Sequence, residues 1–221
     1  MPLLMLDLDN TLVDRDTAFR DAATDFLAEH ALPQNDLAWL MSLDASGYTP
    51  RQEVARALAD RYGTALPDSA VRALLDHGAA DRVVLADAVR DALGRAINGG
   101  WICAIVTNGR VAQQEAKIRN TGLDEIAHGW VVSEAVGHTK PAPEMFRAAA
   151  TAVGASLHGA WMIGDSAHAD IRGAVDIGVQ SVWVSGGLPW SEAAFRPTHV
   201  ADDTASAIGH VINAVRPPTA Q

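Results

Sequence analysis

The chain has 221 residues, of which 48% are hydrophobic and 20% charged, and its formal net charge at pH 7 is −10. No apolar run approaches the roughly 18–20 residues of a membrane-spanning helix, and an acidic surface repels the phosphate backbone of nucleic acids. The N-terminus lacks the basic start of a secretory signal, and the single cysteine, Cys103, has no internal partner for a disulfide. We therefore expect a cytoplasmic protein that binds neither membranes nor nucleic acid, whereas a small anionic substrate in a cleft is compatible with this charge.

The first element is a short apolar run, Leu3–Leu8, which predicts a buried strand. The interval 15–82 contains no convincing strand. Helical spacing of its apolar residues, with Pro50 and Pro67 at favoured helix starts, predicts four helices there. They are expected at about residues 15–30, 35–45, 50–62 and 67–77. The sequence thus predicts a helical domain, residues 15–82, inserted directly after the first strand.

From residue 85 onward, predicted helices alternate with short apolar runs. Nearly continuous hydrophobicity in such runs is typical of strands buried on both faces of a parallel sheet. Repeated strand–helix–strand units build a doubly wound sheet. The predicted fold class is therefore α/β, with a Rossmann-like core formed by residues 1–14 and 83–221. The expected strands are Trp101–Val106, Trp130–Val132, Trp161–Ile163, Ser181–Val184 and His199–Ala201.

A first polar cluster, Asp7-Leu8-Asp9-Asn10-Thr11, lies where the first predicted strand ends. Ligands of open α/β sheets bind at the carboxyl ends of the strands. Residues two apart in an extended chain project to the same side, so we expect Asp7 and Asp9 to face one reaction centre. One carboxylate can attack phosphorus while the other moves the proton of the leaving oxygen. The alternative is an acidic turn with solvated side chains.

A second cluster, Val106-Thr107-Asn108-Gly109, precedes a predicted helix at about 110–120. Hydroxyl, amide and backbone N–H groups at a helix N-terminus stabilise an anion. The alternative is that Thr107 or Asn108 caps the helix.

A third cluster is Lys140-Pro141-Ala142-Pro143-Glu144. The prolines stiffen the backbone, and Pro143 can open the next helix, which leaves Lys140 on a rigid lead-in. A fixed ammonium there would balance the charge of carboxylates and phosphate. The alternative is an ordinary surface lysine.

A fourth cluster, GDSAHAD, spans residues 164–170. Asp165 leaves a strand end and Asp170 lies in the first turn of the next helix. Both are expected to approach Asp7 and a hard cation that prefers oxygen ligands. The alternative for Asp170 is a favourable charge near a helix N-terminus.

Together and in this order, the clusters resemble the motifs of the haloacid dehalogenase superfamily, specifically its phosphatases. DLDNT resembles the nucleophile motif, VTNG the second motif, Lys140 the third and GDSAHAD the acidic fourth. The helical insert is placed like the cap domain of such enzymes. Ala169 is a departure, because many relatives with this motif carry a polar residue before the second acid.

The resemblance implies a role for each motif residue. Asp7 is implied as a covalent nucleophile and magnesium ligand, and Asp9 as general acid and base with its backbone carbonyl on the metal. Asp165 is implied as a further magnesium ligand supported by Asp170. The residues implied to hold the phosphoryl group and neutralise its charge are Thr107, Asn108 and Lys140. The implied activity is magnesium-dependent hydrolysis of a small phosphorylated metabolite through an aspartyl-phosphate.

Three rival functions differ in chemistry. A 2-haloacid dehalogenase would release a halide, which needs no proton, so Asp9 and a magnesium site argue against it. A phosphomutase would return the phosphoryl group to its substrate, and the motifs leave it open as the main alternative. A binding protein without catalysis is disfavoured because every expected catalytic residue is present. The metabolite and the oligomeric state stay undetermined by the sequence.

Within the insert, Gly47-Tyr48-Thr49-Pro50-Arg51 is the expected substrate-contacting segment. Arg51 at a helix start can offer a forked donor to an anionic substrate. The alternative is that Arg51 pairs with a neighbouring acid.

Overall fold

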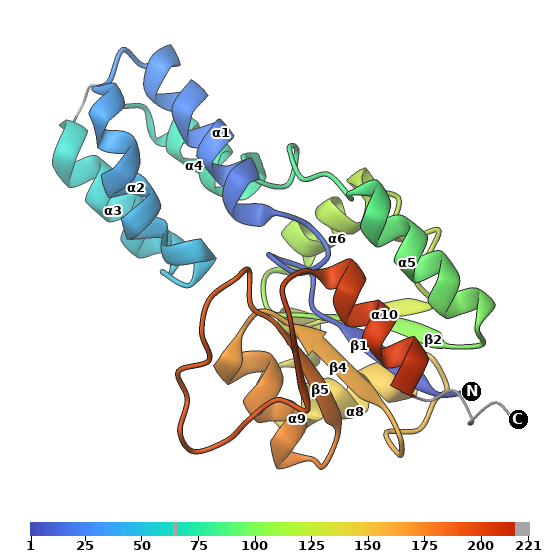
Figure 1. Cartoon of the computed structure of the whole chain (residues 1–221). Helices are drawn as coiled ribbons and strands as arrows, with labels where there is room; N and C mark the ends of the chain where they lie inside the picture. Colours follow the sequence, from blue (N-terminus) through green and yellow to red (C-terminus); the bar gives the residue numbers. More distant parts are fainter. Residues whose placement is uncertain (64–65, 215–221) are drawn as a thin grey trace, which may run out of the picture. The chain divides into compact units, whose positions relative to one another are not determined.

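The computed structural model describes residues 1–63 and 66–214. The chain divides into two compact units (Figure 1), one formed by residues 1–13 and 85 onward and the other by Asp14–Val84. No helix in the described ranges is long and apolar enough to cross a membrane.

The first unit contains a six-stranded sheet in the order β3-β2-β1-β4-β5-β6, and all its pairings are parallel. All four residues of the central strand β1 are buried, as continuous hydrophobicity predicts. The predicted doubly wound α/β fold is confirmed. The strands are β1 (Leu3–Leu6), β2 (Ile102–Thr107), β3 (Gly129–Val132), β4 (Trp161–Gly164), β5 (Gln180–Val184) and β6 (His199–Ala201).

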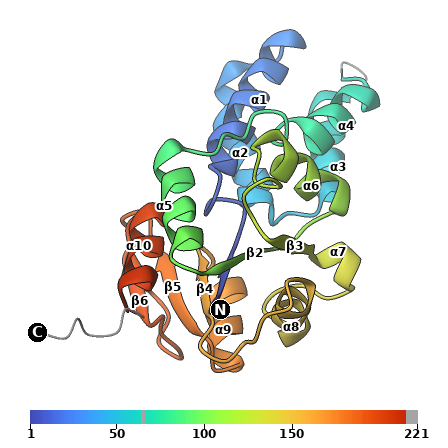
Figure 2. The same cartoon turned by 90° about the vertical axis from the view of Figure 1, so that its right-hand side faces the viewer.

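Helices cover both faces of this sheet. Figure 2 shows α5 and α10 on one side and α8 and α9 on the other. On the α8 side, the apolar core includes Leu3, Met5 and Phe146. The helical elements of this unit are α5 (Asp87–Asn98), α6 (Val111–Asn120), α7 (Ser133–Val136), α8 (Pro143–Ala152), the π-helical segment η4 (Ala167–Arg172), α9 (Gly173–Asp176) and α10 (Thr204–Ala214).

Helices and no strand make up the regular structure of the described residues of the second unit. The expected helix at 35–45 is corrected, because its start is a separate 3₁₀ turn and its end meets Ala45 and Ser46, whose φ angles are 47° and 55°. A left-handed backbone cannot continue an α-helix. Pro50 and Pro67 directly precede two helices as expected. The elements are α1 (Arg15–Glu29), η1 (Gln34–Asp36), α2 (Leu37–Asp44), η2 (Ala45–Gly47), α3 (Arg51–Tyr62) and α4 (Asp68–His77).

Candidate active site

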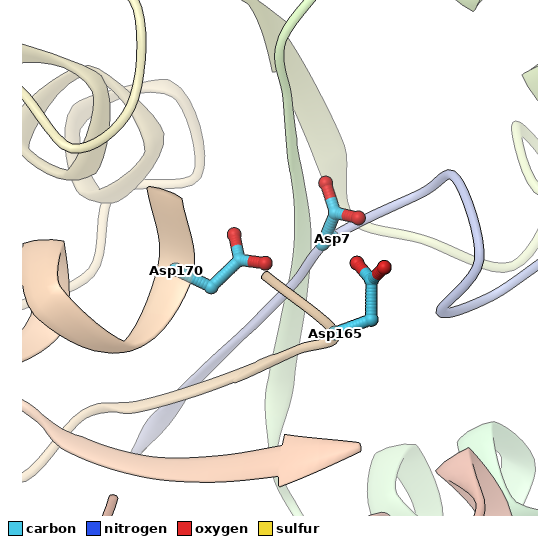
Figure 3. Close-up of side chains that lie close together, drawn as sticks. All are labelled: Asp7, Asp165 and Asp170. Atoms are coloured by element: carbon cyan, nitrogen blue, oxygen red, sulfur yellow. The ribbon is translucent and has the colours of Figure 1, made fainter. Parts of the chain in front are cut away.

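Three aspartates converge at the carboxyl ends of β1 and β4. Asp7 follows β1, Asp165 follows β4, and Asp170 lies in η4. One carboxylate oxygen of each lies within 4.8 Å of the others, and Figure 3 shows the three groups pointing toward one another. The Asp7 N–H donates to the Ile163 carbonyl at 2.9 Å, which extends the pairing of β1 with β4 past the strand. The sheet thereby fixes Asp7 beside the end of β4.

Local backbone geometry holds the two later aspartates. A Cβ placed on Gly164 would come within 2.1 Å of the Asp170 carboxylate, so a residue without a side chain is needed at 164. Backbone N–H groups of the loop also take part: that of Ser166 donates to the Asp170 carboxylate at 3.0 Å, and that of Asp165 donates to the Thr11 hydroxyl at 3.1 Å. The glycine of the GDSAHAD motif therefore leaves room for the Asp170 carboxylate at the end of β4.

Lys140 joins this cluster from the segment before α8. Its ammonium donates to Asp7 at 2.5 Å and to Asp170 at 2.7 Å, and the residue is only 4% exposed. Asn108 braces the lysine backbone, since its side chain accepts from the Lys140 N–H at 2.8 Å and donates to the Lys140 carbonyl at 3.1 Å. Pro143 occupies the start of α8 as expected. Lys140 is thus a buried, oriented cation and not an ordinary surface lysine.

The cluster carries more negative charge than its own lysine balances. Burial raises the pKa of Asp7 to about 7, with Lys140 opposing the rise and Asp170 adding to it. Burial, then the charges of Asp7 and Asp170, raise the pKa of Asp165 to about 8. Burial disfavours the ammonium of Lys140, but the carboxylates of Asp170 and Asp7 outweigh that effect and raise its pKa. Three carboxylates and one ammonium leave a formal charge of −2. A divalent cation that prefers oxygen ligands fits that charge and those donors.

Asp9 is held by different partners. Both of its carboxylate oxygens accept from the Lys117 ammonium at 2.7 Å, and one accepts from the Gln114 amide at 3.0 Å. Because β1 ends at Leu6, the alternation of an extended strand does not govern positions 7–9. Asp7 and Asp9 are therefore bound by separate lysines, a division that sequence spacing alone did not predict.

The second motif contacts both groups, because Asn108 bonds to Lys140 and Thr107 bonds to Gln114. Thr107 is buried at the end of β2 and accepts from the Gln114 amide at 2.5 Å. Neither Thr107 nor Asn108 caps α6, because its N-cap is Arg110 and no side chain of the cap residue bonds there. The first N–H of the helix, at Val111, instead donates to the Glu134 carboxylate at 2.7 Å. The capping alternative for this motif is wrong.

In the helical unit, Arg51 pairs with a neighbouring acid. Its guanidinium donates to Asp44 at 3.0 Å, and its side chain is 20% exposed. Asp44 is fully buried and also accepts from Arg15 and from the Gly47 N–H. The contact foreseen as the alternative for Arg51 is present in the structure. The prediction that Arg51 also meets substrate stays a prediction.

The match to a known protein family spans all four motif clusters. Residues 4–184 match the model of the haloacid dehalogenase-like hydrolase family. Phosphoserine phosphatase of Thermus thermophilus is 38% identical over 96 residues, which cover 43% of this chain and 39% of that protein. Glyceraldehyde 3-phosphate phosphatase of Pyrococcus furiosus is 33% identical over 94 residues, 42% of this chain and 39% of that protein. The chain thus spans about two fifths of the length of these curated relatives.

A solved structure extends the similarity over the whole fold. The HAD hydrolase YfnB from Bacillus subtilis, bound to magnesium, is 25% identical with a TM-score of 0.75, and the match covers 96% of this chain and 98% of that one.

Proposed function

The chain belongs to the haloacid dehalogenase-like hydrolase family, and on that premise we propose that it is a magnesium-dependent phosphatase of a small phosphorylated metabolite. The observation that carries the proposal is the buried cluster of Asp7, Asp165 and Asp170 around Lys140, with its formal charge of −2. Two similar proteins are phosphatases of phosphoserine and of glyceraldehyde 3-phosphate, which supports a small phosphate monoester as substrate.

In this proposal Asp7 is the nucleophile. A carboxylate oxygen of Asp7 forms a bond to phosphorus as the bond from phosphorus to the leaving oxygen breaks, and Asp9 gives that oxygen a proton. Water then attacks phosphorus, Asp9 takes its proton, and the bond between Asp7 and phosphorus breaks to release inorganic phosphate. Lys140, fixed by Asn108, balances charge on the phosphoryl oxygens with help from the polar groups of Thr107 and Asn108.

Asp7, Asp165 and the backbone carbonyl of Asp9 would hold Mg²⁺, with Asp170 orienting the site. The bound cation supplies charge neutralisation, which removes the repulsion between a carboxylate and a phosphate dianion before attack. The carboxylate oxygens of the cluster are the donor type that this ion prefers.

We also propose that the helical unit, predicted at residues 15–82, acts as a cap that selects the substrate. The support is its place in the sequence directly after Asp9 and Thr11, and the presence of Arg51 near the start of α3 as a forked donor for anions.

The direct test is phosphate release from a panel of phosphorylated metabolites, with magnesium and after exhaustive chelation. We expect turnover of at least one alkyl phosphate with magnesium and none without it. Recovery of an isomeric phosphorylated product in place of inorganic phosphate would identify a phosphomutase. Full activity in verified metal-free protein, or no activity on any phosphate with metal, would overturn the proposal.

A further inference from the structure

Lys117 is a buried lysine on α6 that no sequence motif singled out. The residue is 4% exposed, and its ammonium donates to both carboxylate oxygens of Asp9 at 2.7 Å. Burying an ammonium is costly unless a charged, hydrogen-bonded partner compensates it. On the same helix, Arg119 pairs with Glu115 at the surface, with side-chain exposures of 58% and 27%. Lys117 therefore differs from Arg119 in two respects: it is buried, and its partner is the motif residue Asp9 and not a neighbour on the same helix.

Gln114 lies one turn earlier on the same face of α6, because residues three apart in a helix are neighbours. It is 2% exposed. Its carbonyl oxygen accepts from Lys117 at 2.8 Å, which turns its amide group toward the site. That amide donates to Asp9 at 3.0 Å and to Thr107 at 2.5 Å. Two residues of one helix thus link the acid of the first motif to the hydroxyl of the second.

These contacts restrict the carboxylate of Asp9 from two directions. Asp9 sits in a turn after β1, where Leu8, Asn10 and Val13 exchange backbone hydrogen bonds, and its side chain is 25% exposed. A carboxylate at a partly exposed turn samples several rotamers unless donors fix it. Proton transfer requires the acid within about 2.6–3.2 Å of its target, so loss of orientation lowers its efficiency.

We propose that Lys117 and Gln114 are positioning residues that hold the Asp9 carboxylate in line for proton transfer with the leaving group and water. The inference rests on the proposed function, since it assigns Asp9 the proton-transfer role. It predicts that loss of Lys117 or Gln114 slows only the reaction steps that use Asp9. A good aryloxide leaving group departs with little need of a proton, so phosphoryl transfer from an aryl phosphate to Asp7, which kcat/KM measures, should depend little on Lys117 and Gln114.

The test is Lys117→Met, which removes the charge and keeps much of the side-chain volume. We expect kcat/KM for an alkyl phosphate from the panel to fall about 10–100-fold, a part of the 10²–10⁴-fold that acid–base catalysis contributes. For p-nitrophenyl phosphate we expect kcat/KM to change less than about threefold, because the later attack of water on the aspartyl-phosphate, which also uses Asp9, does not enter kcat/KM. Arg119→Met, the matched control on the exposed face of α6, should leave both rates unchanged.

A second comparison separates positioning from general damage. In an Asp9→Asn background, Lys117→Met should not further change the ratio of kcat/KM for the alkyl phosphate to kcat/KM for the aryl phosphate. The carboxylate that Lys117 positions is already absent in that background. Gln114→Met should shift the ratio in the same direction, and it carries the test if Lys117→Met does not fold. Equal losses on both substrates, or a ratio change that persists without Asp9, would refute the inference while leaving the phosphatase proposal intact. A wild-type protein inactive on every phosphate would instead remove the proposed function and this inference with it.

Discussion

Two charge clusters, each centred on buried side chains, differ in their ratio of acids to bases. In the α/β unit, Asp7, Asp165 and Asp170 surround the single ammonium of Lys140. In the helical unit, the buried Asp44 accepts from two guanidiniums, those of Arg15 and Arg51, and Asp16 supplies a second carboxylate to Arg15. The first cluster has a formal charge of −2, whereas the second has as many acids as bases.

This difference in charge balance distinguishes a cluster suited to catalysis from one that stabilises the fold. A balanced buried cluster fixes the chain, and removing one member leaves an uncompensated charge. An unbalanced one is itself unfavourable, and the raised pKa values of Asp7 and Asp165 express that. Such perturbed groups gather at functional sites. The two clusters should therefore respond in opposite ways to loss of a carboxylate.

The largest expected effect is that of Asp7→Asn on turnover. We expect activity to fall by at least about 10³-fold, since nucleophile removal in enzymes costs this much or more. The stability of the metal-free protein at pH 8 should stay equal or rise, because the substitution removes one of three carboxylates that share a single buried ammonium. Steady-state assays and urea unfolding followed by circular dichroism measure the two quantities. Near-normal turnover would show that another group attacks phosphorus.

Asp44→Asn should have the opposite effect, namely a large loss of stability. Because it leaves the buried guanidinium of Arg15 with only the partly exposed Asp16 as a partner, we expect a loss of about 3 kcal/mol, the lower end of the range for breaking a buried pair, in the free energy of unfolding of the helical unit. Urea titration measures it as a shift of that unit's transition. The matched control is Asp25→Asn, which breaks the exposed pair with Arg82 in the same unit and should cost less than about 1 kcal/mol. Equal shifts for both variants would contradict the structural role given to Asp44.

Sequence patterns predicted the sheet well because strands buried on both faces have continuous apolar runs. They also located the three aspartates and Lys140, since strand ends collect in one place. What they missed depended on contacts distant in sequence. Gln114 and Lys117 lie 105 and 108 positions from Asp9, and polar residues at helical spacing ordinarily indicate a solvated face. The pairing of Arg51 with Asp44 remained one of two alternatives until helices α2 and α3 were placed.

The charge imbalance also predicts how pH and magnesium act together. Folded-state pKa values of about 7 for Asp7 and about 8 for Asp165 lie above the ordinary value of 3.8. Between about pH 4 and pH 8 these two carboxyl groups therefore bind more protons in the metal-free folded chain than in the unfolded chain, so their contribution to stability falls as pH rises through this window. Bound cation competes with those protons.

Magnesium should consequently stabilise the protein more at pH 8 than at pH 5.5. At a hundredfold excess over its dissociation constant, we expect about 2–3 kcal/mol at pH 8 and less at pH 5.5. Thermal unfolding with magnesium or with a chelator measures the difference, and Asp165→Asn should reduce the stabilisation at pH 8. The same gain at both pH values would mean that the raised pKa values do not belong to the metal site.

The smallest expected effect concerns Arg51, the more exposed of the two arginines in the balanced cluster. Arg51→Ala should raise KM for the preferred metabolite about tenfold, which corresponds to losing one charge-assisted hydrogen bond. Hydrolysis of a small aryl phosphate should change less than about twofold, since that substrate lacks the recognised group. Stability should change little, because Arg15 still pairs with Asp44. Arg56→Ala, on the exposed side of α3, is the matched control and should alter neither substrate. If both substrates respond alike, or neither does, Arg51 belongs to the architecture of the helical unit alone, and the comparison between the two clusters becomes complete: one is wholly structural and the other wholly chemical.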